Sequence, residues 1–380
     1  MSGLGGEGAF QWSSRLVSQC AGNRQSEVAN RQLRGGCERG PRPVVFLRVY
    51  TPHNQNGGFE FRADVKRIWD EFQRIEKSRD FGNLEGGSVE QHSDRRLQLH
   101  HCANYAAVLN VPKGLGHDPK SSADFGHVPP LRLLEFGCGS GVLSSALAHV
   151  MPDGWTIEAT DYSESLLARA RQRFGCANLC FRFLDVRSIG PERLAGIDAV
   201  LLLEVIEHLP QDEAAGLLHR VYDALPAGGM VVMTTLDRAA FPRAFSGYAP
   251  HFHEYTYRSL SRFLQDRRRS PFETPEVFRL VSERIVSDAV RAEERGGYLW
   301  NRVQRLILSL GRHHAELGAF RGWLESRLFR LYSFLPDRDR FDFEGYLSTL
   351  DFVRSEPELH DRESFGLVAV LRKTGENSPR

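Results

Sequence analysis

The stretch Leu133-Leu-Glu-Phe-Gly-Cys-Gly-Ser-Gly141 joins a short apolar run to an apolar helical pattern, and it decides the fold. Its three glycines stand at alternate positions, so the backbone turns tightly and leaves no side chain where a ligand must approach. The helix that follows offers free backbone N–H groups in its first turn. The spacing is G-x-G-x-G, whereas a dinucleotide-binding loop has G-x-G-x-x-G. Because Glu135 suits a cationic ligand and not a pyrophosphate, the loop favours a cofactor without phosphates over NAD.

Segments of strand length alternate with segments of helix length on both sides of this loop. This alternation predicts right-handed βαβ units and a parallel sheet that helices cover on both faces. Strands are predicted at Leu131–Phe136, Trp155–Thr160, Leu179–Leu184, Ala199–Leu203, Met230–Thr235, Phe278–Val286 and Ser364–Arg372. Helices are predicted at Val142–Val150, Glu164–Phe174, Glu213–Leu225 and Tyr257–Leu264, and an earlier helix carries Val65, Ile68, Trp69, Phe72 and Ile75 on one face.

Composition excludes several classes of protein. The 380 residues include 49 Lys and Arg, 48 Asp and Glu, and 41% hydrophobic residues, so the chain is not a disordered polyelectrolyte. No apolar run of about 18 residues is present, so nothing in the sequence spans a bilayer. The net charge of +1 provides no general attraction to nucleic acid or to an anionic membrane. Six scattered cysteines are too few for a disulfide framework, which predicts a reducing, cytoplasmic environment.

Residues 1–45 differ in composition from the rest of the chain. They are rich in Gly and Arg and show little apolar periodicity, which predicts a disordered leader. No apolar segment typical of a secretory signal is present. Arginines outnumber acidic residues there, so organellar import through a transit peptide remains an alternative to a cytoplasmic location.

Acidic residues follow three of the predicted strands. Asp161 ends the second strand and can accept two hydrogen bonds from the vicinal hydroxyls of a ribose. Asp185 follows the third strand, where it can accept a hydrogen bond from an adenine amine, and Glu204 follows the fourth. Taken singly, each Asp is also explained as a helix cap or a turn residue. Their order along the chain with the glycine loop favours a nucleoside-containing ligand.

At these positions the sequence resembles the class I S-adenosylmethionine-dependent methyltransferase superfamily. The resemblance rests on five ordered motifs and covers about residues 130–265 and the final strand. It implies an α/β fold with a Rossmann-like, seven-stranded, mostly parallel sheet whose last strand is antiparallel, and it implies S-adenosyl-L-methionine as cofactor. The motifs are Glu135-Phe-Gly-Cys-Gly-Ser-Gly141, Asp161-Tyr-Ser, Leu184-Asp-Val186, Leu202-Leu-Glu-Val-Ile-Glu-His-Leu209 and Leu225-Pro-Ala-Gly-Gly229. The cofactor-binding residues it implies are Glu135, Gly137, Cys138, Gly139, Gly141, Asp161, Tyr162, Asp185, Val186 and Glu204.

The resemblance also divides the chain. An N-terminal segment and a helical insertion before the last strand are expected to form a cap over the acceptor site. The expected parts are a leader (1–45), an N-terminal cap segment (46–120), the methyltransferase core (121–287), the helical insertion (288–360), the final core strand (361–376) and a tail (377–380). The segment from Arg262 to Arg340 contains sixteen arginines and eleven acidic residues. This surplus favours a solvated helix face, with peripheral contact to phosphate or to an anionic membrane as the alternative.

Two polar clusters are expected above the carboxyl edge of the sheet. One is Glu204-Val-Ile-Glu-His208, and the other is His251-Phe-His-Glu254. We interpret His208, His251 and Glu207 as the catalytic residues, with a histidine as general base or as the residue that orients the acceptor. A second interpretation makes Glu204, Glu207, His208 and His251 ligands of Mg²⁺ or of a softer divalent ion. A third gives these side chains only structural contacts.

Two groups of methyltransferases share this layout. Ubiquinone-biosynthesis-like and related type 11 and type 12 small-molecule methyltransferases combine E-V-x-E-H-L with H-x-x-E-[FY]-T, which His251–Thr256 fits. Small-RNA 2′-O-methyltransferases hold a metal between similar motifs, but His253, Tyr255 and Tyr257 depart from their pattern. The sequence therefore predicts methyl transfer to a small-molecule acceptor, with O-methylation favoured and nucleic acid disfavoured as a partner. The alternatives are a metal-assisted RNA 2′-O-methyltransferase and a non-catalytic cofactor-binding protein of the same fold.

Overall fold

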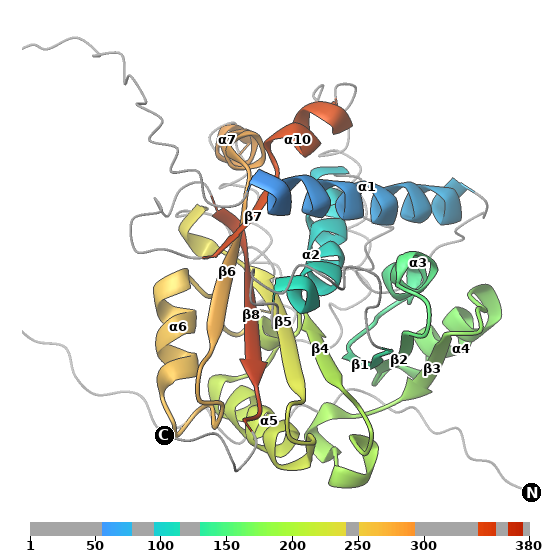
Figure 1. Ribbon diagram of the computed structural model, residues 1–380, viewed down its shortest axis with the longest axis vertical. Helices are drawn as coiled ribbons and strands as arrows, with labels where there is room; N and C mark the ends of the chain where they lie inside the picture. The colour runs from blue at the N-terminus through green and yellow to red at the C-terminus, as the bar shows by residue number, and fades with distance from the viewer. Residues whose placement is uncertain are drawn as a thin grey trace, which may run out of the picture. The chain divides into compact units, whose positions relative to one another are not determined.

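The computed structural model describes residues 55–77, 95–114, 130–240, 251–292, 341–354 and 364–374. These residues build one sheet of eight strands in the order β3-β2-β1-β4-β5-β8-β6-β7 (Figure 1). The strands are β1 Arg132–Phe136, β2 Thr156–Asp161, β3 Leu179–Phe183, β4 Ala199–Leu203, β5 Met230–Leu236, β6 Glu276–Val281, β7 Asp351–Arg354 and β8 Ser364–Arg372.

The sheet is mostly parallel. Strands β1 to β5 pair in parallel, and β8 enters antiparallel between β5 and β6. The Rossmann-like class and the antiparallel last strand are thus confirmed. The sequence predicted seven strands, and the eighth is the short edge strand β7, which pairs antiparallel with β6. Only four residues long and mostly half-buried, β7 lacks the apolar run that marks the central strands.

Apolar side chains pack in two clusters, one on each face of the sheet. Alternation along β1 assigns its side chains to both, because Leu133 belongs to one cluster and Leu134 and Phe136 to the other. The first cluster is covered by α1 Gln55–Lys77, α2 Arg95–Gly114, α3 Val142–Val150 and α4 Glu164–Arg173. The second is covered by α5 Gln211–Ala224 and α6 Tyr257–Gln265.

Helix α1 packs through the apolar stripe that its sequence predicts. Trp69 stacks on Phe343 with ring centroids 5.0 Å apart and lies 5.4 Å from Phe341. The Lys66 ammonium donates to Glu344 at 3.2 Å. Helix α10 (Phe343–Thr349) is therefore joined to the N-terminal helix, and in Figure 1 α1 extends from this region across α2 toward α3.

The strand predicted at Phe278–Val286 is wrong in its second half. Strand β6 ends at Val281, and α7 begins at Glu283 and extends to Ala292. Ser282 causes the change because its hydroxyl accepts the backbone N–H of Ile285 at 3.2 Å, which starts a helical turn. Helix α2 was not predicted at all, although most of its residues from Gln98 to Val111 are buried.

Several expectations lie outside the described residues. These are the leader at 1–45, the region 115–129 before the first core strand, most of the insertion (293–340) and the tail. None of the helices in the described ranges is long and apolar enough to cross a membrane.

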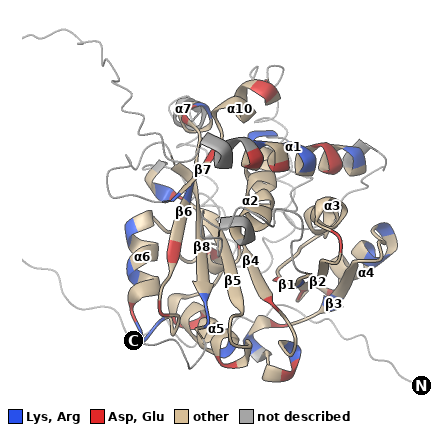
Figure 2. Cartoon of the chain, viewed as in Figure 1, with Lys and Arg blue, Asp and Glu red and all other residues tan. Residues whose placement is uncertain are grey.

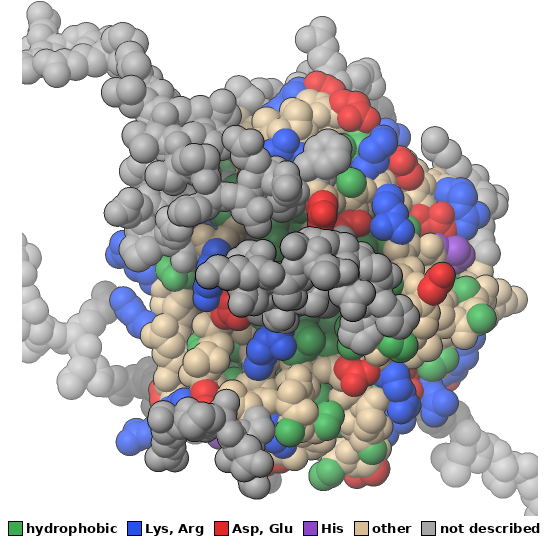
Figure 3. All heavy atoms as spheres, viewed as in Figure 1, with side chains coloured by type: hydrophobic (Ala, Val, Ile, Leu, Met, Phe, Trp, Pro, Cys, Tyr) green, Lys and Arg blue, Asp and Glu red, His purple; other side chains and the backbone are tan. Residues whose placement is uncertain are grey.

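The arginine run at 267–269 is described, and two of its side chains make local contacts. Arg267 donates to the carbonyl of Pro271 at 2.8 Å, and Arg269 donates to Gln211 at 2.7 Å. On the face shown in Figures 2 and 3, basic and acidic side chains are interspersed over the described surface.

Candidate active site

The site lies where the strand order reverses. Strands β1 and β4 are neighbours at the centre of the sheet, and the chain leaves them toward opposite edges. In open α/β sheets ligands bind beyond the carboxyl ends of the strands at this point. The glycine loop after β1 and Glu204 after β4 lie at this point, and Asp161 at the end of β2 and Asp185 after β3 lie at the carboxyl ends of the next two strands.

The glycines of the loop serve two different purposes. All three have positive φ angles, +76° at Gly137, +56° at Gly139 and +76° at Gly141. A methyl group added to Gly139 would meet no atom of the described residues within 4 Å, so among these residues the space beside it is open to a ligand. A methyl group added to Gly141 would lie 2.5 Å from a ring carbon of Phe181. Gly139 therefore borders the open space, whereas Gly141 is required by packing against β3.

Asp161 links the end of β2 to the loop. One carboxylate oxygen accepts the backbone N–H of Gly139 at 2.9 Å, and the other accepts that of Ser163 at 2.8 Å. Burial raises the pKa of Asp161, and these backbone donors oppose the rise. An ionised carboxylate accepts up to about four hydrogen bonds, so Asp161 retains capacity for ligand hydroxyls.

Asp185, just after the end of β3, forms an ion pair with Arg187. The Arg187 guanidinium donates to both carboxylate oxygens, with contacts of 2.8–3.2 Å, and lowers the pKa of Asp185. Nearby, Tyr162 and Phe183 expose 67% and 55% of their surface at the ends of β2 and β3. Val186 is partly buried against the second apolar cluster. The side chains expected near an adenine thus combine a held carboxylate with exposed aromatic rings.

Glu135 is buried beside the loop, with 1% of its surface exposed. Its Oε1 accepts the hydroxyl of Tyr105 from α2. Its Oε2 meets no donor among the described residues. Burial raises the pKa of Glu135 to about 7, although the Tyr105 hydroxyl opposes the rise. Cys138 is also buried, which raises the pKa of its thiol well above the ordinary value, so it is not a reactive thiolate.

Glu204 is held in a strained conformation at the end of β4. Its φ of 56° is the only positive value of a non-glycine residue in the described part of the chain. Such a conformation costs about 1–2 kcal/mol and persists where surrounding contacts enforce it. The carboxylate oxygen Oε1 accepts Asn104 Nδ2 at 3.0 Å and the Thr234 hydroxyl at 3.3 Å, and His100 Nε2 lies 3.6 Å away.

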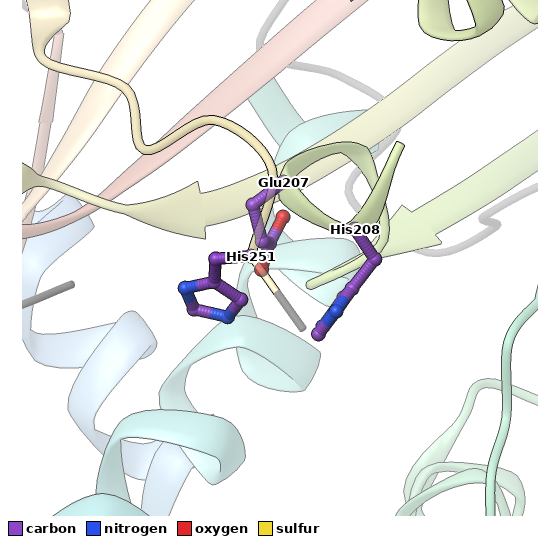
Figure 4. Close-up of side chains that lie close together, drawn as sticks. All are labelled: Glu207, His208 and His251. Carbon is purple, nitrogen blue, oxygen red and sulfur yellow. The ribbon is translucent and has the colours of Figure 1, made fainter. Parts of the chain in front are cut away.

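Glu207, His208 and His251 converge to form a three-residue cluster. Figure 4 shows the Glu207 carboxylate between the two imidazole rings. One donor atom from each residue lies within 4.8 Å of the others. Backbone bonds from Phe252 and His253 to the Glu207 carbonyl join the segment after β5 to the turn after β4. We refer to these three residues as the Glu-His-His cluster.

The carboxylate of Glu207 has an unusual environment. It is fully enclosed, and both oxygens lack a hydrogen-bond donor among the residues that the structure describes. Burial and the neighbouring charge of Glu204 raise the pKa of Glu207 well above its usual range. Burial also opposes the charge on Glu204, but His100 and His101 outweigh it and lower the pKa of Glu204. The two neighbouring carboxyl groups therefore oppose each other's ionisation.

His251 has a fixed ring orientation. Its Nδ1 lies 3.3 Å from Glu254 Oε1, and a carboxylate accepts there, so Nδ1 carries the hydrogen. This tautomer presents Nε2 as an acceptor for a proton or a metal ion.

The structure brings together most of the predicted site residues and adds others. Of the four residues proposed as metal ligands, Glu207, His208 and His251 form the cluster, while Glu204 is engaged by α2 and β5. The prediction missed His100, Asn104 and Tyr105 of α2, which lie at positions i, i+4 and i+5 of a mostly apolar helix. Polar residues at helical spacing on a buried face were the available signal.

The fold, the site and a match to a known family support a methyltransferase domain of the class I S-adenosylmethionine-dependent superfamily, as the motifs predicted. Residues 134–231 match the family model described as a methyltransferase domain.

The curated relatives agree with this class. Over 124 residues the chain is 32% identical to a ubiquinone biosynthesis O-methyltransferase of Xanthomonas campestris pv. campestris, covering 32% of this chain and 50% of the relative. The same enzyme of Azotobacter vinelandii is 32% identical over 116 residues, covering 30% and 47%. The chain spans about half the length of the curated relatives it matches. Among solved structures, a magnesium protoporphyrin IX methyltransferase from Synechocystis PCC 6803 is 20% identical with a TM-score of 0.34, covering 52% of this chain and 82% of that one.

Proposed function

We propose that this protein transfers the methyl group of S-adenosylmethionine to a hydroxyl oxygen of a small-molecule acceptor. One observation supports this most strongly: the space beside Gly139 is open among the described residues, in a loop that follows the buried Glu135 and is bonded to the buried Asp161. The curated relatives, which are ubiquinone O-methyltransferases by name, support the small-molecule acceptor and the oxygen.

The residues beside the loop fit the cofactor. Oε2 of Glu135 is a buried acceptor without a donor among the described residues, and the ammonium group of the cofactor would satisfy it. Asp161 would accept the ribose hydroxyls while it retains its backbone donors. Asp185 and Val186 would contact the adenine. When bound, the cofactor supplies a methyl carbon on a sulfonium, which keeps the electron pair of the broken bond on sulfur.

His251 has the chemistry of the general base. An acceptor hydroxyl must lose its proton as its oxygen bonds to carbon, and Nε2 of His251 can take that proton. Glu254 then stabilises the resulting imidazolium, because its carboxylate accepts the Nδ1 hydrogen at 3.3 Å. The ring of His208 is 4.8 Å from that of His251, edge to face, and would orient the acceptor from the other side.

The Glu-His-His cluster supports a second candidate, in which a divalent ion binds the acceptor oxygen. Two enclosed carboxylate oxygens without donors among the described residues are the observation that favours it. One carboxylate and two imidazoles suit a softer divalent ion better than Mg²⁺, which prefers oxygen ligands. Such an ion would lower the pKa of the acceptor hydroxyl. This arrangement fits the metal-assisted RNA 2′-O-methyltransferase alternative as well as a small acceptor.

Calorimetry with S-adenosylmethionine tests the proposal. The intact protein should bind it, and Asp161→Ala should weaken binding by about tenfold or more because two ribose hydrogen bonds are lost. Asp223→Ala, an exposed position in α5, is the matched control and should bind normally. No binding by the intact protein, or normal binding by Asp161→Ala, would contradict the proposal.

The acceptor is found by transfer of labelled methyl from the cofactor into cell extract, separated into small-molecule, lipid, RNA and protein fractions. Label in the small-molecule fraction supports the proposal, and label in RNA supports the alternative. Cofactor binding without any label indicates the non-catalytic protein. Activity that persists in excess EDTA removes the metal-assisted candidate.

A further inference from the structure

Helix α2 forms one wall of the cofactor site through Tyr105. The side chain of this tyrosine is buried, with 6% of the residue exposed, and its hydroxyl donates to Glu135 Oε1. One residue earlier, Asn104 donates to Glu204. The same helix therefore contacts a carboxylate near the end of β1 and the carboxylate that follows β4, the two strands at the reversal point. Neither contact belongs to the motifs that identify the domain, because α2 precedes residue 134.

Four groups face the Glu135 carboxylate from the elements around it. Burial has the largest effect and raises the pKa of Glu135 to about 7. The Tyr105 hydroxyl on α2 lowers it most, and the Ser144 hydroxyl on α3, which lies close to the carboxylate without hydrogen-bond geometry to it, lowers it less. The charge of Asp161 at the end of β2 raises it. Cys138 in the loop is the fourth group, and its buried thiol is neutral near pH 7. Among these groups, Tyr105 is the strongest that favours the ionised carboxylate.

We propose that Tyr105 is a positioning residue of the cofactor site, which orients the Glu135 carboxylate so that Oε2 receives the ammonium group of the bound amino-acid moiety. The inference rests on the proposed function, because it takes S-adenosylmethionine as the ligand. The hydroxyl of Tyr105 occupies Oε1 and prevents rotation of the carboxylate, while Oε2 stays without a donor among the described residues. Tyr105 acts through Glu135 and has no assigned contact with the reacting atoms.

If Tyr105 positions the Glu135 carboxylate, ligand affinity depends on pH through Glu135, which would not follow if Tyr105 only filled space in the core. An ammonium ligand binds the ionised form of Glu135, so its affinity should rise with pH and level off above the pKa of that carboxyl group. Loss of the Tyr105 hydroxyl removes a contribution that lowers this pKa. The midpoint of the binding profile must then move to higher pH, in addition to a loss of affinity.

The experiment measures the affinity of the full chain for S-adenosylhomocysteine, an unreactive probe with the same amino-acid part, by calorimetry from about pH 5.5 to about pH 8.5. The amino group of the probe belongs to a free amino acid and holds its proton more tightly than a peptide N-terminus, and any loss of that proton is common to all variants. Tyr105→Phe should bind about tenfold more weakly near pH 7, and its midpoint should lie about one pH unit higher. Tyr346→Phe is the matched control, since that buried ring packs against Phe341 and Arg284 in another part of the fold.

Glu135→Gln keeps the inference falsifiable if Tyr105→Phe folds poorly. This variant should bind weakly without the rise in affinity toward pH 7, and adding Tyr105→Phe to it should change affinity by less than about threefold. An unchanged affinity, an equal loss at every pH, or a wild-type pH profile in Glu135→Gln would overturn the inference while leaving the proposed function intact. Failure of the wild-type protein to bind the probe would overturn both.

Discussion

Gly139 and Gly141 lie two residues apart in one loop, and the structure predicts opposite consequences for the same substitution at the two positions. An alanine at Gly141 must adopt a φ near +76°, which costs about 1–2 kcal/mol. Its methyl group would lie 2.5 Å from the Phe181 ring, and overpacking of this kind costs about a further 1–3 kcal/mol. The Phe181 ring is buried and packs against Phe174, and the Cβ of Ala170 lies 3.1 Å from the new methyl group. Gly141→Ala should therefore lower the free energy of unfolding by about 2–5 kcal/mol.

An alanine at Gly139 carries the backbone cost alone, about 1–2 kcal/mol, because in the described part of the chain no atom lies within 4 Å of its methyl group. The methyl group would instead occupy the space assigned to the cofactor. Gly139→Ala should thus remain well folded and lose most of its affinity for S-adenosylhomocysteine.

Urea unfolding followed by circular dichroism measures the first effect, and calorimetry of the folded variants measures the second. The reasoning is refuted if Gly141→Ala is no less stable than Gly139→Ala. It is also refuted if Gly139→Ala binds the probe as well as the wild-type protein does.

Two further predictions concern the buried carboxylates. Asn104→Leu leaves Glu204 without its 3.0 Å amide donor and should lower the free energy of unfolding by about 1–3 kcal/mol in a urea titration; an unchanged stability would show that the contact does not hold Glu204. Burial raises the pKa of Glu135 from 4.5 to about 7, so the folded protein holds a proton that the unfolded chain releases. This contribution to stability is complete below about pH 4.5 and falls by about 3 kcal/mol as the pH rises to about 7. Unfolding titrations across this range should show a smaller fall in Glu135→Gln, and parallel profiles would argue against the raised pKa.

Local patterns predicted the central elements well because their residues need only bury apolar surface at a regular spacing. Strand β4 consists of five apolar residues and has the predicted bounds, as does α3 with its apolar turns. The prediction failed where a single side chain changes the local structure. Ser282 lies between β6 and α7 and caps the first turn of the helix. The spacing of apolar residues does not indicate that a hydroxyl will cap a helix at this point. It also failed at β7, which is too short for a period of two to be visible.

Part of the site was also predictable from local patterns. Parallel strands place their carboxyl ends at one edge, so the order of strands brings Glu135, Asp161 and Glu204 to the same region once the sheet is inferred. The convergence of Glu207, His208 and His251 was proposed from their place after β4 and β5. No strand order reveals that Asn104 of α2 holds Glu204 beside the Glu-His-His cluster.

The sequence by itself indicated the domain class, the cofactor that its motifs imply and the alternation of strands and helices, because these depend on glycine, acidic and apolar residues at fixed short spacings. Only the tertiary structure decided which side chains hold those acids in place. Tyr105 meets Glu135 across 30 positions and Asn104 meets Glu204 across 100. Both contacts arise because α2 packs its buried face against the sheet, and the choice of partner depends on packing between elements, which local spacing does not encode.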